Sequence, residues 1–201
     1  MRSIFITMVM VLHSISGYAQ SEYVKKYSDF PIIVTLQFQA LALPFQDVKS
    51  NFSNIGIGLG TEVSLNDGNN LVQQVSFMWF NNRNAGNRLL FMAQPAWRPQ
   101  IFRDWFLELK LGAGYLYAFR PVESYRLEND RWVSVGKKGK GMLAIPAGFS
   151  IGRLFTIKDT LVSPFMSYQM MALVGYNESI PAMPETIIQI GSRIHLNKHG
   201  N

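Results

Sequence analysis

The segment FLELKLGAGYLYAF, residues 106–119, alternates between two kinds of residue, and this alternation constrains the fold more than any other feature. Large apolar side chains occupy most alternate positions from Leu107 to Tyr117, whereas Glu108, Lys110 and two glycines lie between them. A two-residue period places successive side chains on opposite faces of a β-strand. The segment therefore predicts a strand with one bulky apolar face and one small or charged face.

Seven further segments repeat this alternation, which predicts eight strands in total. They are residues 32–42, 54–65, 71–80, 88–98, 141–152, 162–174 and 186–196. Glutamine is nearly confined to the small or charged face, with Gln73 as the exception. The glutamines on that face are Gln37, Gln39, Gln74, Gln94, Gln169 and Gln189.

The N-terminus has the layout of a cleavable secretory signal. Arg2 precedes an apolar run from Ile4 to Leu12, and Gly17 and Ala19 supply the small residues of a cleavage site. This run is too short to span a bilayer. We expect residues 1–19 to be removed and residues 20–201 to fold as a single domain.

Composition excludes several classes of function. The chain has no cysteine, so it can form no disulfide and offers no thiolate. The formal charge of +6 is modest and partly local, since Lys137, Lys138 and Lys140 lie together. An exported protein does not normally meet nucleic acid, so this charge fits contact with anionic lipid or sugar, or an ordinary soluble surface.

The bulky face of each predicted strand is better suited to lipid than to a protein interior. A narrow barrel accommodates small and polar residues inside, while apolar side chains face hydrocarbon and aromatic residues ring both interfaces. We therefore predict an all-β fold, an eight-stranded antiparallel up-and-down transmembrane β-barrel. A secreted soluble β-sandwich or a lipocalin-like barrel is the alternative. Interface aromatics would be Trp79, Tyr115, Tyr117, Phe119 and Tyr176 at one end, and Trp97 and Trp105 at the other.

The connectors favour one orientation. Those after the second, fourth and sixth strands are short, whereas those after the first, fifth and seventh are longer. Outer-membrane barrels have short periplasmic turns and longer extracellular loops, so we expect a periplasmic N-terminus. Pro95, Pro146 and Pro164 fall within predicted strands, where proline forfeits a ladder hydrogen bond. We expect β-bulges there, or shorter strands.

This layout resembles the small eight-stranded outer-membrane barrels of Gram-negative bacteria, the OmpA/OmpX-like class. The most local element of the resemblance is the last strand, IIQIGSRIHL, which is similar to closing strands read by the barrel-insertion machinery. Members of this class usually end on an aromatic residue, whereas here Leu196 is followed by NKHGN. The resemblance implies outer-membrane lipid, lipopolysaccharide and the insertion machinery as partners.

Charged residues on the predicted inner face define one candidate site. Strand direction places them all in the same half of the lumen, which is the space inside the ring of strands. Buried charges must be paired, so we expect an ion-pair network that plugs the barrel. Its members would be Glu62, Arg98, Glu108, Lys110 and Arg193.

The longest predicted loop provides the other candidate site. Its sequence SYRLENDRWVSV reads as a hairpin that turns at Asn129-Asp130, within residues 120–140. Such a hairpin would leave a strand edge available to an extracellular or envelope protein partner. The candidate binding residues are Tyr125, Leu127, Trp132, Lys137, Lys138 and Lys140. An ordered loop without a partner is the alternative.

These features predict a non-enzymatic outer-membrane protein with a filled lumen. Only His195 and His199 remain after signal removal, so we expect no catalytic site, metal site or cofactor. The His-Ser motif of lipid-modifying barrel enzymes is not visible. A narrow channel or a lipid- or small-molecule-binding transport barrel is the alternative function.

Overall fold

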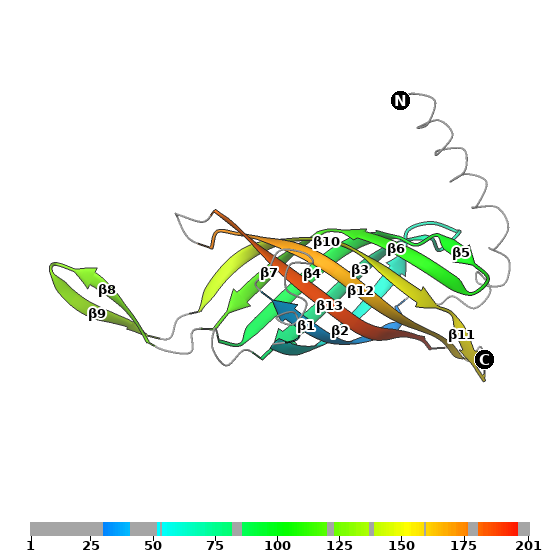
Figure 1. The fold of residues 1–201 in the computed structure, drawn as a ribbon, viewed down its shortest axis with the longest axis horizontal. Coiled ribbons are helices and arrows are strands. Elements are labelled where there is room, and N and C mark those ends of the chain that lie inside the picture. The colour runs from blue at the N-terminus through cyan, green and yellow to red at the C-terminus, as the bar shows by residue number, and fades with distance from the viewer. Residues whose placement is uncertain are drawn as a thin grey trace, which may run out of the picture.

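The computed structural model describes eight ranges of the chain and shows a barrel with a projecting hairpin (Figure 1). The described residues are 30–40, 52, 54–81, 86–119, 123–136, 139–158, 160–176 and 181–196. The predicted signal segment, residues 1–19, lies outside them.

Most of the described chain is β-strand. The strands are β1 (Ile32–Ala40), β2 (Asn54–Ser64), β3 (Leu71–Phe80), β4 (Arg88–Trp97), β5 (Gln100–Phe102), β6 (Trp105–Leu111), β7 (Ala113–Ala118), β8 (Ser124–Glu128), β9 (Arg131–Gly136), β10 (Lys140–Arg153), β11 (Phe155–Ile157), β12 (Thr160–Val174) and β13 (Ala182–His195).

Eight antiparallel ring strands close into a barrel. The order is β1, β2, β3, β4, the pair β6 and β7 as two pieces of one strand, β10, β12 and β13, and β13 pairs back to β1. Closure leaves no unpaired strand edge in the ring, as hydrocarbon requires. The predicted eight-stranded up-and-down transmembrane barrel is confirmed.

The two ends of the barrel differ in their connections. At the terminal end, where Ile32 of β1 and His195 of β13 lie, β5 and β11 form short hairpins with β6 and β12. At the opposite end, the hairpin end, β8 and β9 project as a separate two-stranded sheet (Figure 1). The two ends are called by these names below.

Strand boundaries agree with the alternation in the sequence. β3 covers the predicted residues 71–80, and β2 and β4 each end one residue before the prediction. The largest difference is at β13, which begins at Ala182 rather than at residue 186. Those four extra residues pair with β12 beyond the segment whose alternation was visible.

The prolines interrupt hydrogen bonding without shifting the register. β6 and β7 are separated by Gly112, which lies opposite Pro146 of β10 on one side and opposite Gln94, the residue before Pro95, of β4 on the other. Gly112 donates its N–H to the Pro146 carbonyl at 3.0 Å, but proline has no N–H to return. In the same way, Pro164 lies opposite Arg153, where the pairing of β10 with β12 ends just before β11. The expected β-bulges were wrong at all three prolines, whose pairings show no register shift.

Only glycine fits at this interruption. A Cβ atom on Gly112 would lie 2.3 Å from the carbonyl oxygen of Ala93 and 2.7 Å from Cγ of Gln94. Neighbouring strands thus approach more closely than a side chain allows, which explains one of the glycines in the opening segment.

The apolar face of the strands points outward. Ile57, Phe91 and Leu109 expose 66%, 51% and 46% of their surface, whereas Glu62 and Lys110 expose 1% and 6%. A soluble barrel would show the reverse. The exposed apolar residues instead form a belt around the ring, which is the surface that lipid covers in a transmembrane barrel.

Aromatic residues flank this belt at both ends. Trp79 and Phe119 lie near the hairpin end with ring centroids 6.3 Å apart, and Phe119 also contacts the Tyr117 ring at 5.0 Å. Trp97 and Trp105 are partly exposed near the terminal end. Aromatic side chains prefer these two levels of a membrane because their rings are apolar and their edges polar.

Replacing Leu59 by arginine tests the belt. Leu59 is 62% exposed and pairs with Phe77 near the middle of the strands. We expect Leu59→Arg to lower the free energy of unfolding from lipid vesicles by about 2–4 kcal/mol, the cost of an arginine near the bilayer midplane. Denaturant titration followed by tryptophan fluorescence measures this loss.

Leu127→Arg on the projecting hairpin is the matched control. Leu127 is 54% exposed but lies outside the ring, so the substitution should leave the unfolding midpoint unchanged. Equal losses for the two variants would show that the belt is not covered by lipid.

Candidate functional site: the lumen and the projecting hairpin

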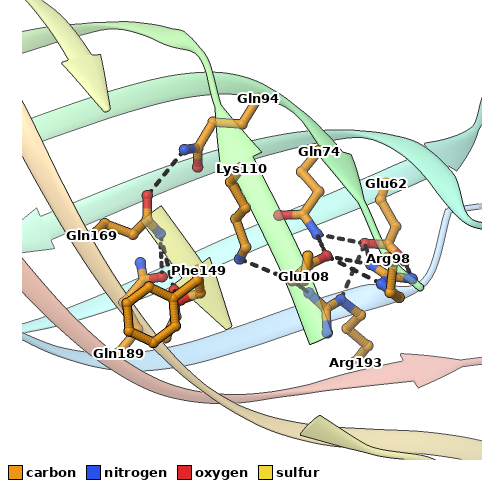
Figure 2. A network of polar contacts seen from close by, with 11 residues as sticks. Glu62, Gln74, Gln94, Arg98, Glu108, Lys110, Phe149, Gln169, Gln189 and Arg193 are labelled. Atoms are coloured by element: carbon orange, nitrogen blue, oxygen red, sulfur yellow. Dashed lines mark hydrogen bonds and ion pairs between the residues drawn. The ribbon is translucent and has the colours of Figure 1, made fainter. Parts of the chain in front are cut away.

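Two carboxylates and three cations meet inside the barrel near the terminal end. The structure brings together all five residues of the sequence-predicted network: Glu62 of β2, Arg98 directly after β4, Glu108 and Lys110 of β6, and Arg193 of β13 (Figure 2). The exposed fraction is 6% or less for every one of them. The network therefore connects opposite walls of the lumen.

Glu62 is held by both arginines. Arg98 binds it in a bidentate manner, with Nη1 donating to Oε1 at 2.8 Å and Nη2 to Oε2 at 2.5 Å. Arg193 Nε donates to Oε2 at 3.1 Å. Such paired, charge-assisted bonds fix the orientation of the carboxylate as well as its charge.

Glu108 is the centre of the network because all three cations reach it. Arg98 Nη2 donates to its Oε1 at 2.8 Å, and Arg193 Nη2 donates to its Oε2 at 2.7 Å. Lys110 Nζ lies 3.2 Å from Oε2. Gln74 links the two carboxylates, with its Nε2 donating to Glu108 at 2.7 Å and to Glu62 at 2.9 Å.

Two phenylalanine rings lie against the cations. The guanidinium carbon of Arg193 is 4.2 Å from the Phe165 ring centroid and 5.5 Å from that of Phe106. Arg98 also lies over Phe106, and Lys110 lies over Phe165. These rings pack with the buried Ile33. Faces of aromatic rings attract cations, more strongly where water is excluded, so the aromatic cluster supports the ion pairs.

A chain of glutamine amides crosses the lumen above the charged network. Gln94 donates to Gln169 at 3.0 Å and Gln169 to Gln189 at 2.8 Å (Figure 2). Gln189 in turn donates to Gln37 at 3.1 Å. All six glutamines that the alternation placed inward are at most 7% exposed. The four amides of the chain bond to one another where water is excluded, whereas Gln39 and Gln74 donate to buried glutamates.

The hairpin half of the lumen is apolar, which the sequence analysis did not anticipate. Its buried cluster consists of Met78, Phe80, Leu90, Met92, Leu116, Met142, Ala144, Met171, Leu173 and Ile187. Methionine is prominent because its flexible side chain fills irregular gaps. The five-residue charged network that the sequence predicted is therefore confined to the other half.

A second buried ion pair lies in the same half of the barrel and was also missed. Arg88 of β4 contacts Glu185 of β13, which also accepts a hydrogen bond from Gln39. Glu185 is fully buried and Arg88 is 5% exposed. The predicted last strand began at residue 186, so Glu185 was assigned to a loop. Continuing the parity of the strand by one residue would have revealed it.

The hairpin of β8 and β9 is the other candidate surface. Asn129 and Asp130 both have positive φ, 48° and 59°, as a two-residue type I′ turn requires. Leu127 pairs directly with Trp132, and Tyr125 pairs with Ser134, so these four residues share one face. Tyr125, Leu127 and Trp132 are 58%, 54% and 71% exposed.

Of the remaining predicted residues, the one that the structure describes does not join this face. Lys140 lies at the start of β10 and donates to the carbonyl of Tyr176. Lys137, Lys138 and His199 lie outside the described residues. Within the described part of the chain, no group of three or more potential ligands could hold a metal ion, and no helix is long and apolar enough to cross a membrane.

Comparison with known proteins identifies the fold. No protein-family model matches the chain, and no curated protein matches it in sequence. Among solved structures, Neisserial surface protein A is similar over 84% of this chain and 98% of its own, with a TM-score of 0.56 and 11% identity. The chain has the fold of the small outer-membrane β-barrels.

Two more barrels of this fold are similar to the chain at lower scores. The N-terminal barrel domain of OprF from Pseudomonas aeruginosa has a TM-score of 0.39 and 10% identity, covering 82% of this chain and 96% of its own. Ail from Yersinia pestis has a TM-score of 0.36 and 12% identity, covering 82% and 99%. Both TM-scores are below 0.5, so only the first similarity supports the fold.

Neutralising Glu108 tests the network. Glu108→Gln should lower the free energy of unfolding of the barrel by about 3–5 kcal/mol, because it leaves buried cations without their shared partner. Denaturant titration in lipid vesicles measures the change.

The control breaks an exposed ion pair. Arg153 and Asp104 lie 3.5 Å apart with 42% and 54% of their side chains exposed, so Asp104→Asn should cost less than about 1 kcal/mol. If Glu108→Gln cost no more than Asp104→Asn, the lumen network would be contributing nothing to the stability of the barrel.

Proposed function

We propose that this protein is a non-enzymatic outer-membrane barrel with a closed lumen, which presents the β8–β9 hairpin to an extracellular protein partner. The observation that carries the proposal is the hairpin, which projects from the ring and exposes an apolar face of Tyr125, Leu127 and Trp132. Exposed apolar surface of this kind marks interaction sites on soluble parts of proteins. The barrel is then a rigid membrane anchor.

The contents of the lumen favour an anchor over the alternative of a channel. The charged network fills the terminal half, and an apolar cluster of fully or nearly fully buried side chains fills the other half. A conducting path would have to displace both. The interior of an eight-stranded barrel is only wide enough for side chains.

The hairpin suits a partner that adds a strand. β8 and β9 form a sheet of their own, and a two-stranded sheet is at best marginally stable in water. An extended segment of a partner could pair with a free edge, where main-chain hydrogen bonds supply affinity. The apolar face would then be covered by side chains of that partner.

The fold and the belt support an outer-membrane location. The fold is that of outer-membrane barrels, and the short turns all lie at the terminal end, as periplasmic turns do in such barrels. This arrangement supports a periplasmic N-terminus and an extracellular hairpin. Lipopolysaccharide would surround the hairpin end, and the insertion machinery would act on β13.

Planar-bilayer recording tests the closed lumen. We expect the purified barrel to show no discrete channel openings, because both halves of the lumen are packed. Glu108→Ala should not change this result, since the apolar half would still block the path. Openings in the wild-type barrel that change in Glu108→Ala would favour the transport alternative.

Single-cysteine variants test the hairpin, because the natural chain has no cysteine. Ser134→Cys places a thiol beside Trp132 with little change in shape, and Asp67→Cys places one in a terminal-end turn. In intact cells, a membrane-impermeant maleimide that carries a photocrosslinker should label residue 134 only. Illumination should then give a covalent adduct with a second protein, identified by mass spectrometry.

Two results separate the parts of this proposal. Labelling at residue 67 instead of residue 134 would show that the barrel has the opposite orientation in the membrane. Labelling at residue 134 without an adduct, or an adduct that persists when Leu127 and Trp132 are both replaced by serine, would refute partner binding through the apolar face.

A further inference from the structure

The charges buried in the lumen do not balance. Among the described residues, the buried carboxylates are Glu62, Glu108 and Glu185, whereas four side chains of lysine or arginine are buried with them. Glu185 pairs with Arg88 near the hairpin end. The terminal-end network therefore holds two carboxylates and three cations, Arg98, Lys110 and Arg193, which leaves one positive charge in excess.

Lys110 is the cation with the fewest partners. Within the part of the chain that the structure describes, each arginine donates to both carboxylates, whereas Lys110 Nζ has one acceptor, Glu108 Oε2 at 3.2 Å. A lysine ammonium has three N–H groups to donate. Its side chain is only 3% exposed, so bulk water does not provide the missing acceptors. Desolvation of an uncompensated charge is costly.

A cavity lies beside Lys110. Its volume is about 20 Å³, and its lining includes Lys110, Thr35, Ser76 and three amides of the glutamine layer, Gln94, Gln169 and Gln189. One water-sized occupant needs roughly 10–15 Å³. The cavity is therefore large enough for a single atom or molecule of that size and too small for sulfate or phosphate.

The cavity also offers one donor and one acceptor that the lumen network leaves unused. Gln94 Nε2 has two N–H groups, and the structure directs it to one acceptor, Gln169 Oε1. Gln74 also lines the cavity and presents its carbonyl oxygen, since its Nε2 is engaged by Glu62 and Glu108. Water could satisfy these hydrogen bonds, but it would not compensate the charge.

We propose that this cavity is a binding site for a monatomic anion of the halide class, such as chloride. The anion would accept hydrogen bonds from the Lys110 ammonium and the Gln94 amide. It would bring the terminal-end network to three negative and three positive charges. Lys110 is buried and an apolar cluster fills the other half of the lumen, so the ion is a structural component of the folded barrel rather than a transported species.

Crystals of the wild-type barrel grown in sodium bromide test the site directly. Bromide scatters X-rays anomalously, so a bound ion gives an anomalous difference peak in the cavity beside Lys110. The proposal predicts this peak. Ordinary solvent density without an anomalous peak would show that water occupies the cavity and would overturn the proposal.

Thermal unfolding in detergent tests the charge argument. At equal sodium concentration, the wild-type barrel should unfold at a higher temperature in bromide than in gluconate, because an ion that binds only the folded state stabilises it. Lys110→Met removes the excess charge and should abolish the difference between the two salts. Should this variant fail to fold, the bromide crystals of the wild type still decide the question.

Arg88→Met is the matched control. It removes one buried cation from the other ion pair, so it should lower the unfolding temperature in both salts while the difference between bromide and gluconate persists. If Lys110→Met kept the full difference, the salts would be acting elsewhere and the site would be refuted.

Discussion

Closure of the ring between β1 and β13 is the constraint on which the rest of the structure depends. Nine residue pairs, from Ile32 opposite Ile194 to Ala40 opposite Thr186, join the first strand to the last. Without them, two rows of backbone N–H and carbonyl groups would face hydrocarbon, where each unsatisfied group costs several kcal/mol. The same pairing carries Arg193 into the lumen to meet Glu62 of β2. The ladder that satisfies the backbone thus also assembles the charged network.

A closed ring of eight strands leaves a narrow interior, and the two halves of this lumen are filled by different means. Buried ion pairs seldom stabilise a protein more than apolar packing of the same volume would, but removing one partner is costly. The stability of the terminal half therefore depends on a particular set of charged partners. The stability of the methionine-rich half depends on the total volume of its apolar side chains, so that half tolerates substitution by other apolar residues of similar size. Phe106 and Phe165, beside Arg193, combine both kinds of interaction, because they pack as apolar residues and their rings attract the cations.

The alternation of residue types was sufficient for the ring but not for all of its interior. In β3, Gln74 and Ser76 mark the inner face, and parity alone carries that face on to Met78 and Phe80. Those two residues resemble their outward neighbours Phe77 and Trp79 in hydrophobicity, so composition gives no sign of which side they occupy. Similarly, the five charged residues could be placed inward from their strands, but which cation reaches which carboxylate depends on strand register and tilt. Glu185 was missed because its strand continues past the visible alternation.

The structure separates two physical requirements that a membrane protein must meet. The ring suits hydrocarbon because each of its strands pairs with a neighbour on both sides and because its apolar face points outward. These two requirements leave the sequence of the ring little freedom to vary. The β8–β9 hairpin lies beyond the belt, where water can satisfy an open edge, and it carries Trp132 with 71% of its surface exposed. Nothing in the packing of the ring requires that residue. An aromatic side chain that the fold does not need, held on a sheet with free edges, is the reason why we propose a partner that covers it.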